Sequence, residues 1–130
     1  MKKRNSLRVP VTAGLKDIYA MDMHAAYQAA CLGQFNVLAF GRLAAAISVV
    51  RTALVTHQTP IENAVEILDQ TIEVLHQVRN HGDATNEWKI AEQDRPTVLM
   101  GIEVAEQCIG TLDVALLATT AEKLLQDVSA

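Results

Sequence analysis

The chain has 130 residues, of which 50% are apolar and only 4% aromatic, and its formal net charge is −4. This length fits one domain with a continuous core, and so few aromatic side chains exclude a core built on aromatic packing. Alanine and leucine are abundant and favour helix over sheet. We therefore predict an all-α protein.

The first 16 residues differ in charge from the rest of the chain. They carry five basic residues and no acid, whereas residues 17–130 carry six basic residues against 15 acids. Pro10 and Gly14 disfavour helix. We predict an extended basic N-terminal arm over residues 1–16 and a single helical-bundle domain over residues 17–130. No apolar stretch follows the basic residues at signal-peptide spacing, so no secretory signal is expected.

The first helix of the domain is predicted from about Asp17 to Leu32, with Gly33 as a left-handed stop. Apolar residues at three- and four-residue steps form one stripe along it, which should face the core. The stripe consists of Ile18, Met21, Ala25, Ala29 and Leu32.

The second helix is predicted from about Phe35 to Thr56 and is apolar nearly all round. Its two charges, Arg42 and Arg51, would each cost about 2.5–3.5 kcal/mol at a bilayer centre, which favours a buried helix over a membrane span. A second strip of mostly small residues lets another helix approach closely: Phe40, Gly41, Ala44, Ala45 and Ser48. The neighbour on this strip is either another helix of the chain or the same helix of a second subunit, so a homo-oligomer is one expectation.

Three further helices complete the predicted bundle of four main helices and a short C-terminal one. The third begins at a capping box, Thr59 to Glu62, with Pro60 at the first helical position, and it ends near Gly82. A polar linker follows, then a fourth helix from about Asp94 and a short fifth helix from about Thr119. Gly110 is expected to bend or break the fourth helix.

No catalytic, metal or cofactor constellation emerges from the residues. Glu73 and His76 have the Glu-x-x-His spacing of di-iron bundles, but Glu103 and Glu106 offer no second matching histidine. Phosphate loops and nucleophile elbows are not found. Cys31 and Cys108 are interpreted as reduced core residues of a cytoplasmic protein. We therefore expect a non-enzymatic protein without a cofactor.

Two surfaces are candidates for binding a protein partner. Glu62, Glu66, Asp69 and Glu73 follow one another at steps of four, three and four on the third helix, and we call them the acidic ridge. They form either an ordinary solvated face or a docking surface, for a basic partner or for the protein's own basic arm. The other candidate is Trp88, which either caps the core from the linker or is an exposed binding residue.

The basic arm suggests an alternative function. Lys2, Lys3, Arg4 and Arg8 would supply about four phosphate contacts to a nucleic acid. The acidic domain, which has neither a basic recognition helix nor an aromatic stacking surface, argues against it.

The C-terminal third resembles small uncharacterised helical accessory proteins of bacterial phages and prophages. The resemblance rests on Glu87-Trp88-Lys89-Ile90 in a polar linker, Pro96 to Leu112 as an aliphatic helix, and Ala121 to Leu125. It implies a protein that inhibits or adapts a larger host assembly, for example in anti-defence. We thus predict a cytoplasmic protein-binding module that does not act at a membrane, with a nucleic-acid-binding accessory protein as the alternative.

Overall fold

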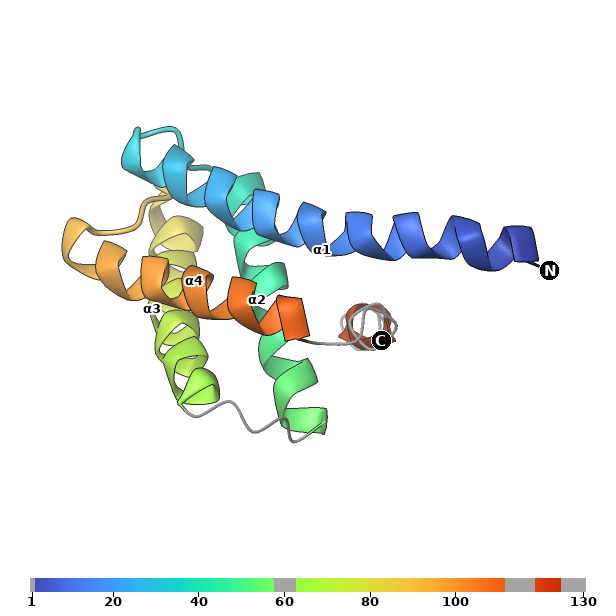
Figure 1. Ribbon diagram of the computed structural model, residues 1–130. Helices are drawn as coiled ribbons and strands as arrows, with labels where there is room; N and C mark the ends of the chain where they lie inside the picture. The colour runs from blue at the N-terminus through green and yellow to red at the C-terminus, as the bar shows by residue number, and fades with distance from the viewer. Residues whose placement is uncertain (1, 58–62, 112–118, 125–130) are drawn as a thin grey trace.

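The computed structural model describes the backbone of residues 2–57, 63–111 and 119–124, with side chains for residues 16–56, 63–111 and 119–124. Its elements are α1 (Lys2–Cys31), α2 (Val37–His57), α3 (Ala64–Thr85), the 3-10 helix η1 (Glu92–Asp94) and α4 (Arg95–Thr111). Residues 119–124 form a short C-terminal helix (Figure 1). The described ranges contain no strand, and the all-α fold with four main helices and a short fifth is confirmed.

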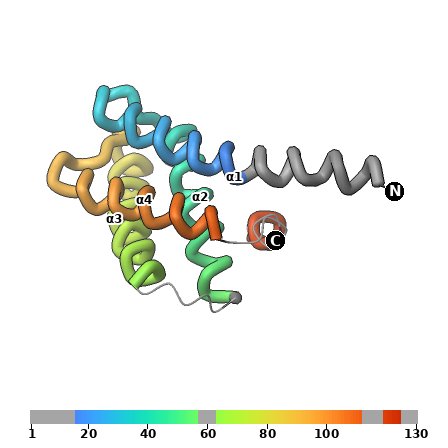
Figure 2. Tube along the Cα trace, in the orientation of Figure 1, coloured from blue at the N-terminus to red at the C-terminus, as the bar shows by residue number. Residues whose placement is uncertain are grey.

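The four main helices pack as two connected pairs. α1 turns into α2 through Gly33, whose φ of 72° is the left-handed conformation that glycine favours. α3 packs along α4, and α2 contacts both α3 and α4. Figure 2 shows α1 crossing α2 near the turn, with the short C-terminal helix beside the middle of α2. Because α1 also contacts α4, the two pairs enclose one core.

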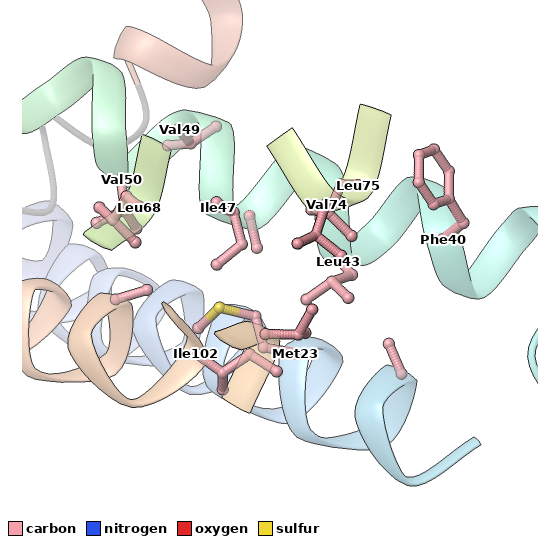
Figure 3. Packing of buried hydrophobic residues seen from close by; sticks show 14 of the residues in the cluster. Met23, Phe40, Leu43, Ile47, Val49, Val50, Leu68, Val74, Leu75 and Ile102 are labelled. Atoms are coloured by element: carbon pink, nitrogen blue, oxygen red, sulfur yellow. The ribbon is translucent and has the colours of Figure 1, made fainter. Parts of the chain in front are cut away.

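The core is aliphatic, as predicted from the composition. Met23 of α1, Ile47 of α2, Leu68 of α3 and Ile102 of α4 are all fully buried. Figure 3 shows Met23 and Ile102 facing Leu43 and Ile47 of α2. Every main helix therefore contributes to the same apolar cluster.

α3 and α4 touch most closely where a glycine faces a threonine. Thr71 of α3 is fully buried, and its hydroxyl donates to the carbonyl oxygen of Ile67 at 3.0 Å and to that of Thr97 at 3.3 Å. A Cβ placed on Gly101 of α4 would lie 2.8 Å from both the Cβ and the Cγ2 of Thr71. Gly101 therefore permits the close approach of the two helices, although glycine is a weak helix former.

Four helix boundaries differ from the predicted ones. α1 begins at Lys2, so helical backbone replaces the extended backbone predicted over the arm. A helix nucleated over residues 17–31 propagates at little cost through lysine, arginine and leucine, whereas Pro10 and Gly14 oppose it by about 3 and about 1 kcal/mol. α2 begins at Val37 because the Asn36 Oδ1 accepts the Ala39 N–H at 2.8 Å, an N-cap that the prediction missed.

The start of α3 is the third difference. The capping residues Thr59 to Glu62 lie outside the described residues, and α3 begins at Ala64 after Asn63, which is left-handed at φ 64° and makes no side-chain cap. At the other end the helix runs three residues past Gly82 to Thr85. There Asn86 adopts φ 59° and donates its N–H to the Gly82 carbonyl oxygen at 2.7 Å. In α4 the backbone is helical at Gly110 and Thr111, and the residues that follow lie outside the described ones, so the bend or break expected near Gly110 stays a prediction.

The buried face of α1 is not the predicted one. Ile18, Met21 and Leu32 are 54%, 69% and 69% exposed, whereas the neighbouring positions Met23, Ala26 and Ala30 are buried. α1 carries two apolar stripes, and the stripe with Met23 fits between α2 and α4. Cys31 is exposed for the same reason, which corrects its assignment to the core, whereas Cys108 is buried and both thiols are free.

α2 is long and apolar enough to cross a membrane over Val37–Thr56, and 44% of its most apolar window is buried inside the protein. A core helix of a soluble protein meets the same criterion. Part of the second strip also has neighbours within the chain: Phe40 is buried, and Ala44, Ala45 and Ser48 line a groove together with Leu124 of the C-terminal helix.

Candidate functional site

The acidic ridge lies on the outer face of α3. Glu66, Asp69 and Glu73 are exposed, and Glu62 lies outside the described residues. The Asp69 carboxylate accepts a hydrogen bond from the Arg51 Nε of α2 at 2.8 Å. Asp69 therefore ties α3 to α2, and the charges that the ridge offers to a partner are those of Glu66 and Glu73.

Trp88 is half-buried and caps the core from the loop between α3 and η1. Its ring centroid lies 5.1 Å from that of Phe40, which meets Phe35 edge-on at 6.5 Å. The indole covers Gly82, where an added Cβ would come within 2.5–2.7 Å of three ring atoms. These contacts account for Trp88 as a residue that caps the core, which is the first of the two interpretations given above.

Charged groups surround the tryptophan loop. The Glu87 carboxylate lies 2.8 Å from the Lys89 Nζ and 3.5 Å from the His81 Nε2. The hydrogen bond from Lys89, followed by its charge and the hydrogen bond from His81, lowers the pKa of Glu87. These solvated contacts hold the loop and make no enclosed site.

Polar contacts also join α1 to α4. The His24 Nε2 pairs with the Glu106 Oε2, both half-exposed. Burial, and then a hydrogen bond with Cys31, raises the pKa of Tyr27, and the positive charge of Arg95 opposes this shift. The Arg95 Nε is buried without a hydrogen-bond partner among the described atoms. Of these groups, the His24–Glu106 pair is the direct polar contact between α1 and α4.

The exposed apolar stripe of α1 is the feature that the sequence prediction missed. We call Ile18, Met21, Ala25, Gln28 and Leu32 the outer stripe; all five are exposed. Seven large apolar side chains are exposed among the described residues, and five of them lie on α1, directly after its last residue or in the first turn of α2. Besides three outer-stripe residues these are Val37 and Leu38. An apolar surface of this kind is typical of a protein-interaction site.

Two hollows flank the outer stripe. One is lined by Asp22, Ala25, Leu38 and Arg42 among others and lies between α1 and α2. The second, about 450 Å³, is a mainly apolar groove. Tyr19 and four residues of α2 line it, together with Ala121 and Leu124 of the C-terminal helix. Neither hollow brings together a nucleophile, a base and an oxyanion donor.

The remaining predicted residues add no chemistry to these surfaces. Lys2, Lys3, Arg4 and Arg8 fall within α1, and their side chains lie outside the described ones. Glu73 and His76 are both exposed on α3. Within the ranges that the structure describes, no three His, Cys, Asp or Glu side chains are grouped so that they could hold a metal ion.

Comparison with models of protein families, with curated proteins and with solved structures found no match for this chain.

Proposed function

We propose that this protein is a non-enzymatic module that works through protein–protein contacts. The observation that carries the proposal is the outer stripe, where Ile18, Met21 and Leu32 are each more than half exposed although they lie on a helix whose opposite face is fully buried. Leaving such side chains in water forgoes about 1.5–3 kcal/mol each relative to burial. A partner surface that covers them recovers this free energy.

The acidic ridge is proposed as a second contact, for a basic surface on a larger bacterial assembly. Glu66 and Glu73 lie on the exposed face of α3, which is a different helix from the one carrying the outer stripe. Together with the resemblance of the C-terminal third, this supports a cytoplasmic inhibitor or adaptor of a phage or prophage, for example in anti-defence. Complementary charge mainly raises the association rate and selects the partner.

Charge reversal on the ridge tests this second contact. In the double variant Glu66→Lys and Glu73→Lys, we expect capture of a partner from bacterial lysate to fall about tenfold or more, because repulsion replaces attraction. Asp69 is kept because it pairs with Arg51. The matched control is Glu103→Lys with Glu122→Lys, which changes two exposed acids elsewhere by the same charge. Equal loss in both variants would contradict a role for the ridge.

The same capture experiment separates the alternative function. If the protein binds nucleic acid, replacing Lys2, Lys3, Arg4 and Arg8 together by glutamine should abolish binding, and wild-type affinity should fall steeply with salt. If it binds protein, nuclease treatment should leave the captured partner unchanged. Loss of capture in the arm variant and after nuclease treatment, with the ridge variant unaffected, would favour the nucleic-acid function.

A further inference from the structure

The outer stripe has the spacing of a helix–helix seam. Its five residues follow one another at steps of three, four, three and four, the repeat by which two helices pack side by side. The stripe runs over 15 residues, 14 steps of the helix, or about 21 Å at the standard helical rise. Met23 and Ala30 lie on the opposite, buried face, so the seam faces away from the protein's own core.

We propose that a second copy of this chain covers the outer stripe, with the two α1 helices antiparallel. This inference rests on the proposal that the outer stripe is a protein-binding surface, and it names the occupant. In the seven-residue repeat, Ile18, Ala25 and Leu32 hold the first position (a), and Met21 and Gln28 hold the fourth (d). In antiparallel pairs, the a residues of one helix face the d residues of the other. Met21 then faces Leu32 of the second copy, and Ala25 faces Gln28 of the second copy. Met21 and Leu32 thus lie toward the two ends of the seam, and Ala25 lies beside the two-fold axis.

Charge beside the stripe favours this orientation. In a parallel pair, Asp17 would face Asp22 of the second copy, and the two-fold symmetry would impose this repulsion twice. In the antiparallel pair, Asp22 faces Ala29 of the second copy and no acid meets an acid along the seam. Arg42 lines the same hollow as Asp22. The two-fold axis across the seam places the α2 of both copies on the same side of the α1 pair. Each Asp22 therefore lies on the side that carries Arg42 of the other copy.

The other surfaces of the protein fit a copy less well. The acidic ridge repels itself, so it does not form a two-fold contact. Ala44 and Ala45 of α2, in the strip that the sequence offered for self-association, line a groove partly walled by the chain's own C-terminal helix. A dimer through the outer stripe leaves the acidic ridges of both copies on α3, available to a different partner.

The first test is oligomeric mass. Light scattering should report twice 14.2 kDa for the wild type at high micromolar concentration, and Met21→Lys should return the mass to that of one chain. Met100→Lys is the matched control, because Met100 is also exposed but lies on α4. It should leave the dimer intact. Circular dichroism of both variants verifies that they fold.

Cysteine cross-linking tests the orientation, in a Cys31→Ser background. The double variant Met21→Cys and Leu32→Cys should form interchain disulfides on mild oxidation, whereas neither single variant should, because in the antiparallel pair each position meets the other and not itself. Disulfides in the single variants would show a parallel pair and overturn the orientation.

Three results would overturn the dimer itself. They are a single-chain mass throughout the micromolar range, equal disruption by Met21→Lys and Met100→Lys, and an uncross-linked double-cysteine variant. A protein that is monomeric yet still captures a partner through the acidic ridge would refute this inference and leave the proposed function standing. A dimer that captures no partner would support this inference and contradict the proposed role of the acidic ridge.

Discussion

Replacing Leu68 by alanine should destabilise the protein by about 2–5 kcal/mol, because the lost side chain leaves a cavity where α3 meets the core. Leu68 is fully buried in the apolar cluster to which all four main helices contribute. Equilibrium unfolding in urea, followed by circular dichroism, measures the change.

Leu38→Ala is the matched control for this substitution. Leu38 lies in the first turn of α2 and is 61% exposed, so its truncation should cost less than about 0.5 kcal/mol. Equal costs at the two positions would contradict the burial of Leu68.

The second large effect is expected from Gly101→Ala at the contact between α3 and α4. The new methyl group would meet Thr71 at less than ordinary contact distance, and overpacking of this kind costs about 1–3 kcal/mol. Displacing the Thr71 hydroxyl from its carbonyl partners adds a buried unsatisfied group, which costs about 1–3 kcal/mol more. We expect a lower urea midpoint with an unchanged slope.

Gly110→Ala provides the control within the same helix. An added Cβ at Gly110 meets nothing within 4 Å, and alanine is the better helix former by roughly 0.5–1 kcal/mol. This substitution should therefore stabilise the protein. If both glycine variants stabilised the protein, helix propensity and not the close approach to Thr71 would determine the outcome at Gly101.

The sequence predicted the number and order of the helices because each one repeats its apolar residues at helical spacing. α3 has only one apolar stripe, and this stripe, which includes Leu68, is buried. The sequence misplaced the buried face of α1, because Ile18 and Met23 begin two stripes with equally good spacing. Only the packing of α2 and α4 against α1 decides between them.

The candidate site was harder to predict than the fold for the same reason. An exposed apolar stripe cannot be told from a core stripe until the rest of the bundle is placed, so the outer stripe was interpreted as core. The acidic ridge was found from spacing alone, but the pairing of Asp69 with Arg51 joins residues from two helices and has no local signature. The role of Gly101 likewise depends on Thr71, 30 residues earlier in the chain.

Trp88 is placed so that its intrinsic fluorescence reports on the packing of one part of the bundle. Trp88 is the single tryptophan of the chain, and its indole touches Phe40 of α2 and covers Gly82 of α3. Its emission therefore changes when this one corner opens, whereas circular dichroism follows all the helices. Coincident unfolding curves from the two signals would define one cooperative unit, and an earlier fluorescence change would identify the corner between α2 and α3 as the first part to separate.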